Sequence, residues 1–127
     1  MIQSGTFLNV VDNSGAKTVC CIRVSKGFKR RYGFPGDVIL VSVKALRRKR
    51  KVNSKVKKGD MLKALVVRTK VPTKDFTGNS ITFLENSVVL LNNQNKPIGS
   101  RVFGVVKDTF QYSKFNKISS LTDSILY

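Results

Sequence analysis

Short apolar runs broken by turn residues constrain the fold of this chain more than any other feature. The runs occupy residues 6–11, 17–25, 37–45, 61–69, 80–83, 87–91 and 100–106. Runs of this length that are rich in β-branched residues and bounded by Gly, Asp, Asn or Ser are typical of β-strands. The turn sequence Asp12-Asn13-Ser14-Gly15 joins the first two runs and predicts a β-hairpin. The pattern therefore predicts a mainly β protein, and closure into a β-barrel would remove exposed strand edges.

A partial internal repeat supports this layout. Gly36-Asp37 opens one predicted strand, and Gly59-Asp60 opens the next. Glycine permits the backbone conformation of a tight turn, and aspartate accepts hydrogen bonds from nearby backbone N–H groups. We therefore interpret both aspartates as turn residues and not as catalytic acids.

Only the C-terminal part of the sequence has a helical pattern. Phe115, Ile118 and Leu121 recur at a spacing of three, as the apolar face of a helix would, and Ser113 is a candidate N-cap. We expect a helical segment over about residues 105–121, at the end of a single domain that spans residues 1–127.

The chain has a formal net charge of +17, and its basic residues are clustered. Eight of the twelve residues at positions 47–58 are basic and none is acidic. Two further clusters comprise Lys26, Lys29, Arg30 and Arg31, and Lys63, Arg68, Lys70 and Lys74. Like charges at this density repel one another unless a polyanion lies nearby, and nucleic-acid phosphates are the usual partner. The alternative of a uniformly solvated basic surface does not account for the clustering.

Two aromatic residues lie beside the second basic cluster. Tyr32 and Phe34 are candidates for stacking on an unpaired base, although Phe34 has the alternative role of plugging one end of the barrel. The sequence has no RNP aromatic motif, GXXG clamp, helix-turn-helix or zinc finger. Recognition of nucleic-acid shape is therefore favoured over recognition of a short sequence.

Catalytic, metal-binding and membrane functions find little support in the sequence. The chain has no histidine, and its seven acidic residues are scattered, so we expect neither an enzyme nor a metal or cofactor site. Adjacent Cys20 and Cys21 would point to opposite faces of a strand, which disfavours a disulfide between them. No apolar run is long enough to cross a bilayer, and the first residues do not resemble a signal or transit peptide. We expect the protein to work where it is made, or this sequence to be a mature form.

An ordered set of segments resembles the L-fourteen family of universal large-subunit ribosomal proteins, in its bacterial and organellar type. The opening Leu8-Asn9-Val10-Val11-Asp12 and the later Pro97-Ile98-Gly99-Ser100-Arg101 are among them. The full set covers residues 1–3, 8–16, 21–24, 30–32, 36–37, 56–60, 63–70, 89–93, 97–104 and 114–118. Each segment alone is weakly specific, but their order along nearly the whole chain is highly specific.

The resemblance implies a closed five-stranded β-barrel with a projecting β-hairpin and small C-terminal helices. It also implies a non-enzymatic protein that binds large-subunit rRNA, touches neighbouring large-subunit proteins and contributes to an intersubunit bridge with small-subunit rRNA. Together with the charge clusters, it gives as candidate RNA-binding residues Asn13, Ser14, Lys17, Arg23, Lys29, Arg30, Arg31, Tyr32, Arg47, Arg48, Lys49, Arg50, Lys51, Lys57, Lys58, Arg68 and Lys70. For Asn13, a role in the turn alone is the alternative.

The same resemblance implies a second functional surface. Ser100, Arg101, Lys114 and Lys117 would meet either the small subunit or a ribosome-silencing factor, and these two uses exclude each other. A free-standing RNA-binding barrel with a chaperone-like role is the alternative function. Frequent Lys, Asn, Ile and Phe fit an AT-rich coding sequence and favour the ribosome of the mitochondrial matrix, with plastid and bacterial cytoplasm as alternatives.

Three departures from the family pattern are visible. Residues 47–54 form a longer and more basic stretch than the usual family form. Thr77 precedes Gly78 where Asp, Asn or Ser is preferred, which suggests a different turn type. The tail after Leu121 also differs from the bacterial ending.

Overall fold

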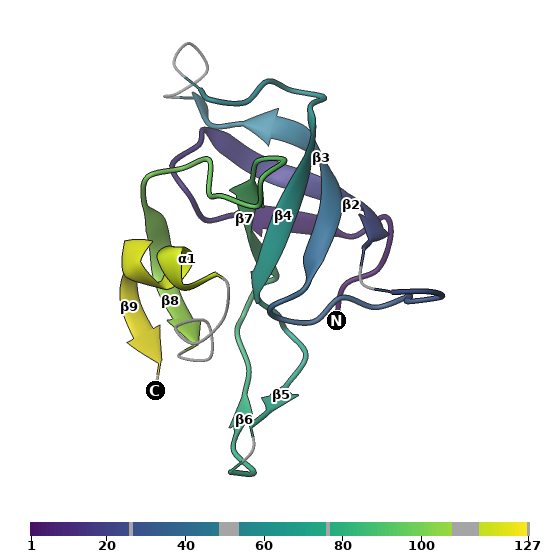
Figure 1. Cartoon of the computed structure of the whole chain (residues 1–127), viewed down its shortest axis with the longest axis vertical. Coiled ribbons are helices and arrows are strands. Elements are labelled where there is room, and N and C mark those ends of the chain that lie inside the picture. Colours follow the sequence, from purple (N-terminus) through teal and green to yellow (C-terminus); the bar gives the residue numbers. More distant parts are fainter. Residues whose placement is uncertain (26, 49–53, 76, 108–114, 127) are drawn as a thin grey trace.

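A closed five-stranded β-barrel forms the centre of the protein (Figure 1). The computed structural model describes residues 1–25, 27–48, 54–75, 77–107 and 115–126. The barrel strands, in their order around it, are β1 (Phe7–Val10), β2 (Ala16–Val24), β3 (Val38–Leu46), β4 (Met61–Arg68) and β7 (Ser87–Leu91). Neighbours are antiparallel except β1 and β7, whose parallel pairing closes the barrel. The predicted mainly β fold, its closed barrel and the hairpin of the first two strands are confirmed.

Alternate side chains of the strands fill the barrel interior, as a period of two requires. Leu8 and Val10 of β1 and Val41 and Val43 of β3 are all fully buried there. Cys21 points into the same core, whereas the adjacent Cys20 is only half-buried, and both thiols are free. The interpretation of the two cysteines as strand residues is therefore confirmed.

A second core explains why parts of β4 and β7 are apolar without interruption. Ala64 and Val66 face the barrel interior, while the alternating Leu65 and Val67 are buried on the other side of β4. Every residue of β7 is buried. Strands covered on both faces need a continuous apolar run, because neither face meets water.

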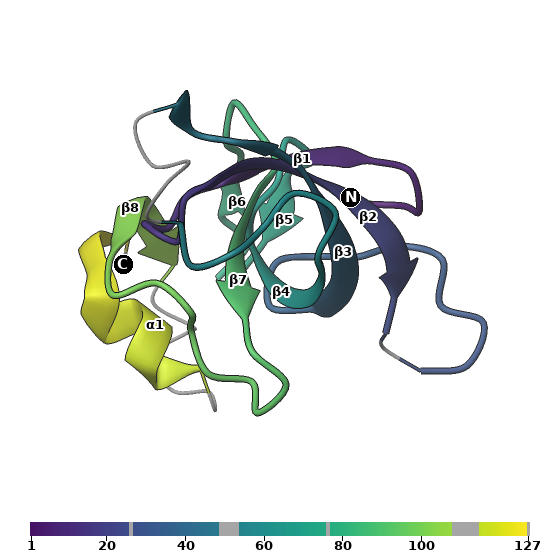
Figure 2. The same cartoon turned by 90° about the horizontal axis from the view of Figure 1, so that it is seen from above.

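The C-terminal segment covers that outer face of the barrel. It consists of β8 (Val102–Lys107), α1 (Asn116–Leu121) and β9 (Thr122–Leu126), and β8 pairs in parallel with β9. Figure 2 shows this segment beside the barrel and not across its ends. Ile118 and Phe115 are buried in the second core and Leu121 packs against it, so the predicted apolar helix face is confirmed.

The predicted range of the helical segment, 105–121, is too long. Residues 105–107 belong to β8, where the β-branched Val105 and Val106 pair with β9. The candidate cap Ser113 lies outside the described residues, and Phe115 at the N-cap position makes no side-chain capping hydrogen bond. The tail after Leu121 forms a strand that the sequence pattern did not indicate.

A small hairpin projects from the barrel between β4 and β7 (Figure 1). It pairs β5 (Thr73–Lys74), which was not predicted, with β6 (Ser80–Ile81). The turn places Gly78 at a φ of 86°, so the left-handed position falls on glycine and the preceding Thr77 causes no difficulty there. An ion pair of 3.4 Å between Lys107 and Asp75 links the hairpin to the end of β8.

The internal repeat forms two equivalent turns. Oδ2 of Asp37 accepts a hydrogen bond from the N–H of Phe34, and Oδ2 of Asp60 accepts one from the N–H of Lys57, both at 2.9 Å. The preceding glycines have φ angles of 94° and 91°. The interpretation of both aspartates as turn residues is confirmed.

Candidate nucleic-acid interface

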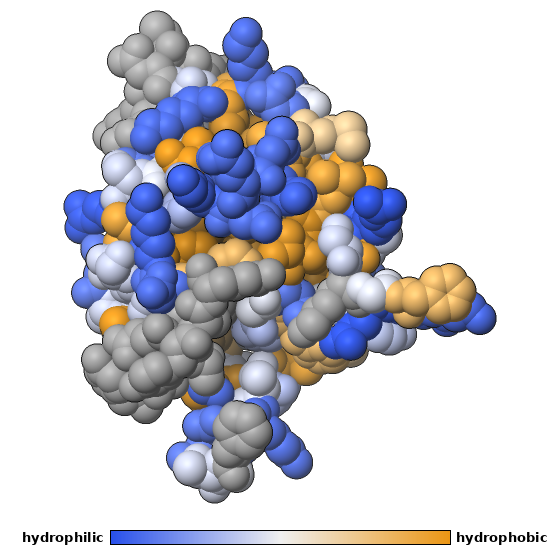
Figure 3. All heavy atoms as spheres, viewed as in Figure 1, coloured by the Kyte–Doolittle hydropathy of each residue, from blue (hydrophilic) through white to orange (hydrophobic). Residues whose placement is uncertain are grey.

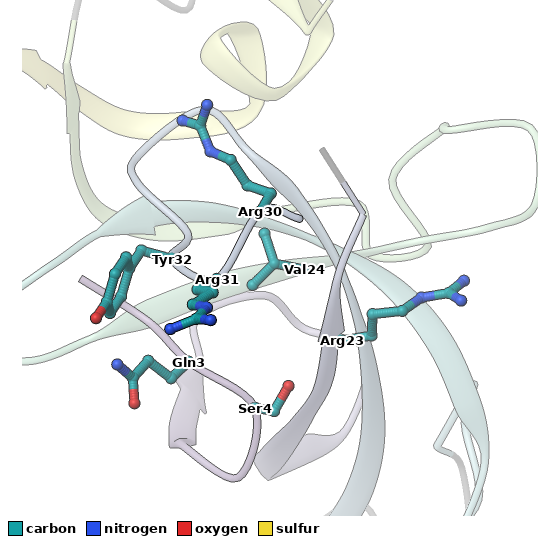
Figure 4. Close-up of a pocket in the computed structure, with 7 residues that line it drawn as sticks. All are labelled: Gln3, Ser4, Arg23, Val24, Arg30, Arg31 and Tyr32. Carbon is teal, nitrogen blue, oxygen red and sulfur yellow. The ribbon is translucent and has the colours of Figure 1, made fainter. Parts of the chain in front are cut away.

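One end of the barrel carries a shallow basic pocket of about 430 Å³, which we call the arginine pocket. Its lining comes from the N-terminal segment, the end of β2 and the β2–β3 loop, and comprises Gln3, Ser4, Arg23, Val24, Arg30, Arg31 and Tyr32. Arg31, Tyr32 and Gln3 extend in a similar direction, whereas Arg23 and Arg30 extend away on two other sides (Figure 4). Three guanidinium groups that diverge suit an extended polyanion better than one small anion.

The base of the β2–β3 loop is fixed by backbone pairing. Ile2 donates its N–H to the Gly33 carbonyl at 3.0 Å, and Gly33 donates its own to the Ile2 carbonyl at 2.7 Å. The Ile2 side chain is fully buried and packs in the barrel core near Ile39. A Cβ at position 33 would lie 3.5 Å from Ile39 Cγ2 and 3.6 Å from Ile2 Cβ, which are ordinary van der Waals contacts. The basic residues 29–31 thus project from a loop whose base is held by backbone hydrogen bonds.

The aromatic residues of the loop remain accessible. Phe34 is 40% exposed and lies under the Arg30 guanidinium, 5.9 Å from ring centre to Cζ, so the alternative that it plugs the barrel is wrong. Ile2 occupies the buried position at that end of the barrel. Tyr32 is also partly exposed in the arginine pocket, which leaves its ring available for stacking.

The basic run at residues 47–58 divides into residues with different positions. Lys49, Arg50 and Lys51 lie outside the described residues. Arg48, Lys57 and Lys58 are exposed, as a phosphate-binding role requires. Lys57 and Lys58 lie in the turn before β4.

Arg47 instead turns toward the protein. Its Nη2 donates a hydrogen bond to the Val10 carbonyl at 3.0 Å, and its Cζ lies 5.8 Å from the centre of the Phe103 ring. These contacts join the end of β3 to β1 and β8. Lys17 is exposed beside it and lines, with Arg47 and Glu85, a shallow pocket of about 330 Å³.

Arg68 is also unlike a phosphate-binding residue, because its side chain is only 13% exposed. Its Nη2 donates to the Phe103 carbonyl at 3.3 Å and lies 4.0 Å from Glu85. Burial lowers the pKa of the Arg68 guanidinium, and the Glu85 carboxylate counteracts this. Lys70, two residues later, is exposed. The structure therefore separates these two candidates, with Arg68 in a structural contact between β4 and β8.

The first turn is held by two side chains that make structural contacts. Oδ1 of Asn13 accepts a hydrogen bond from the Ser100 N–H at 2.7 Å, and its Nδ2 donates to the Ser100 hydroxyl at 2.8 Å. Oδ1 of Asp12 accepts both the N–H and the hydroxyl of Ser14, while Oδ2 accepts the N–H of Leu90 at 3.0 Å. Asn13 thus does more than form the turn, since it ties the turn to the segment before β8.

The sequence reasoning placed Asp12 in the first turn and assigned it no contact beyond that turn. It is fully buried, and burial raises the pKa of its carboxyl against the lowering effects of its hydrogen bonds and of Arg47. The spacing of Asp12 and Ser14 is a local signal for such a turn. Its contact with Leu90 has no local signal, because the two residues are 78 positions apart.

The second predicted surface lies on the C-terminal segment. Ser100 and Arg101 are exposed just before β8, and Lys117 is exposed on α1. Nη2 of Arg101 pairs with Oδ1 of Asp123 on β9 at 3.0 Å, and its Cζ lies 5.4 Å from the Phe103 ring centre. Lys114 lies outside the described residues.

Within the described part of the chain, no group of three or more His, Cys, Asp or Glu residues is arranged to hold a metal ion. The one described helix is too short to cross a membrane.

A comparison with protein families agrees with the resemblance noted in the sequence. The model of a family described as ribosomal protein L14p/L23e matches residues 1–126 of the chain. The match covers the barrel, the projecting hairpin and the C-terminal segment, and so includes both candidate surfaces.

Proposed function

The chain belongs to the ribosomal protein L14p/L23e family, and from this premise we propose that its arginine pocket binds the phosphate backbone of large-subunit rRNA. The protein is a structural constituent of the large ribosomal subunit, where it associates with rRNA and with other ribosomal proteins. The family is structural and not enzymatic. Our proposal concerns which of the basic residues make the rRNA contact.

The composition of the arginine pocket is the observation that carries this proposal. Three arginines and a tyrosine line it, and none of the described residues that line it is acidic. Arginine binds phosphate through two parallel hydrogen bonds, and each neutralised phosphate releases counterions. Arg48, Lys57 and Lys58 supply further exposed charge, whereas Arg47 and Arg68 are committed to backbone carbonyls within the protein.

Gradient sedimentation tests the ribosomal association, and a matched pair of variants tests the pocket. We expect the wild-type protein to sediment with large subunits at physiological salt. Arg30→Ser/Arg31→Ser should shift a substantial fraction to the top of the gradient. Lys44→Ser/Lys96→Ser removes the same charge from exposed positions outside the pocket and should change the distribution much less. Equal effects of the two double variants would refute the assignment to the pocket. A wild-type protein found free of large subunits would favour the free-standing RNA-binding barrel.

We further infer that the surface around Arg101 contacts the small subunit at an intersubunit bridge. The guanidinium is exposed, yet its pairing with Asp123 and its position over Phe103 restrain it. A restrained exposed cation loses little side-chain entropy when it binds a phosphate. Lys117 adds a second exposed cation on the same C-terminal segment. A ribosome-silencing factor bound to this surface would exclude the small subunit.

Subunit joining measures this second role directly. Arg101→Glu should reduce the fraction of large subunits that join small subunits, while leaving large-subunit assembly nearly unchanged. Asp123→Ser removes the ion pair that restrains the arginine but keeps its charge, so it should reduce joining less than Arg101→Glu does. Equal loss of assembly and joining in Arg101→Glu would instead make Arg101 a residue of the fold or of an rRNA contact.

We also propose the mitochondrial matrix as the compartment of this ribosome. The abundance of Lys, Asn, Ile and Phe supports the proposal, because an AT-rich genome encodes these residues preferentially. Fractionation of the source cells would test it. Recovery of the protein with plastid or cytoplasmic ribosomes would refute it.

A further inference from the structure

The end of the β2–β3 loop carries an exposed aromatic side chain that the proposed phosphate contacts do not use. Phe28 is 91% exposed, more than any other described aromatic residue. The loop projects away from the barrel in both views (Figures 1 and 2), and its surface shows hydrophobic atoms beside hydrophilic ones (Figure 3). An apolar ring in water at a projecting position requires an explanation, because large aromatic residues usually contribute their area to a core or an interface.

The backbone and the neighbouring charges define the surroundings of this ring. Gly27 and Lys29, on either side of Phe28, have positive φ angles of 86° and 55°. A lysine in this left-handed region is uncommon. The backbone of this turn therefore has a defined conformation, in which Phe28 lies between two left-handed residues. Lys29 Nζ lies over the ring, 5.5 Å from its centre, which occupies one face of the ring and leaves the other for a partner.

We propose that Phe28 stacks on an unpaired base of RNA while Lys29 and Arg30 bind the flanking phosphates. This inference rests on the proposed rRNA-binding function of the same loop. An aromatic ring beside cations matches a nucleotide, which presents an apolar base face and an anionic backbone within one unit. An apolar pocket of a partner protein would match the ring but would have to bury or neutralise the cations around it.

A pair of RNA hairpins, identical except for one bulged nucleotide, tests the inference with the full-length protein. We expect the wild type to bind the bulged hairpin more tightly than the fully paired one. Phe28→Ser should weaken binding to the bulged hairpin by about 5- to 100-fold and leave the paired hairpin nearly unchanged. Phe28→Tyr should retain the preference. Leu84→Ser is the matched control, because Leu84 is 96% exposed on the separate loop between β6 and β7 and should not affect either hairpin.

A spectroscopic measurement reports the stacking itself. The chain contains three tyrosines but no tryptophan, so Phe28→Trp introduces a single tryptophan at the loop end, whose emission can be excited selectively. The bulged hairpin should quench its emission and protect it from a soluble quencher, and the paired hairpin should do so much less.

Several outcomes would overturn the inference while leaving the proposed function intact. These are equal loss on both hairpins in Phe28→Ser, no preference of the wild type for the bulged hairpin, or unprotected Trp emission in the complex. Unchanged RNA binding in Phe28→Ser with weaker retention in large subunits would assign the ring to a protein partner instead. A wild-type protein that binds neither hairpin would refute the inference and the proposed function together.

Discussion

Replacing Gly104 with alanine tests the buried contact between Arg68 and β8. Gly104 has a φ of 85°, and an added Cβ would overlap Nη1 of Arg68 and lie 3.1 Å from its Cζ. Alanine in the left-handed region destabilises the folded state by about 1–2 kcal/mol. Alanine also lowers the conformational entropy of the unfolded chain relative to glycine, which offsets about 0.4–1 kcal/mol of this cost. Moving the guanidinium off the Phe103 carbonyl removes a charged hydrogen bond worth about 1.5–3 kcal/mol. We therefore expect Gly104→Ala to lower the free energy of unfolding by about 2–4 kcal/mol.

Gly78→Ala is the matched control for this prediction. Gly78 has nearly the same φ, 86°, but a Cβ there would meet no atom within 4 Å. Only the backbone strain remains, so the control should cost about 1 kcal/mol. Urea unfolding of both variants, followed by circular dichroism, gives the two free energies directly.

A double-mutant cycle separates the clash from the strain. In an Arg68→Met background, the cost of Gly104→Ala should fall to that of Gly78→Ala, because the overlapping guanidinium is absent. Equal costs of Gly104→Ala and Gly78→Ala in the wild-type background would refute the reasoning. They would mean that Arg68 moves aside without losing any stabilising contact.

Two further predictions concern aspartates. Asp37→Ala and Asp60→Ala should each lower the free energy of unfolding in urea by at least about 1 kcal/mol, because each carboxylate accepts a backbone hydrogen bond at the same position of its turn; a variant that unfolds at the wild-type urea concentration would contradict this role. Burial raises the pKa of Asp12, so the folded state takes up a proton at higher pH than the unfolded state. The stability advantage of the wild type over Asp12→Asn should therefore grow as the pH falls toward the ordinary carboxyl pKa; an advantage that shrinks would show that hydrogen bonds to the ionised form dominate.

The barrel could be predicted from sequence because its signals are local. Each strand of the barrel is a short apolar run, and turn residues separate successive runs, as in Asp12-Asn13-Ser14-Gly15. The glycine and aspartate of each repeated turn act on residues only a few positions away. The number of strands and the parallel closure of β1 on β7 are not local, and only the family resemblance supplied the number.

The C-terminal segment was harder to predict because its signals conflict. The helical spacing of Phe115, Ile118 and Leu121 was genuine, but extending the helix back to residue 105 overlapped the strand predicted over residues 100–106, which the structure ends at Lys107. β9 shows only a weak alternation of buried and exposed residues. Its pairing partner β8 is separated from it in the sequence by the helix α1. Short strands of this kind are specified by their partner more than by their own sequence.

The candidate site was predicted as a set of basic residues. The structure shows which of their side chains are exposed to solvent and which contact the protein itself. Arg30 and Arg31 are exposed in a pocket, as the basic cluster suggested. Arg47 and Arg68 belong to equally basic segments, yet each donates to a carbonyl of a strand that is distant in sequence. Charge density alone could not distinguish these roles, because the distinction depends on tertiary contacts with Val10 and Phe103.

The salt dependence of rRNA affinity tests the central claim most directly. Each phosphate contact contributes about 0.7–0.9 to the slope of log affinity against log salt concentration. For Arg23→Ser/Arg30→Ser/Arg31→Ser, we predict a slope shallower by about 2–3 than that of the wild type, because all three arginines line the arginine pocket. A slope equal to that of the wild type would contradict the claim, since it would mean that these arginines contact no phosphate in the complex.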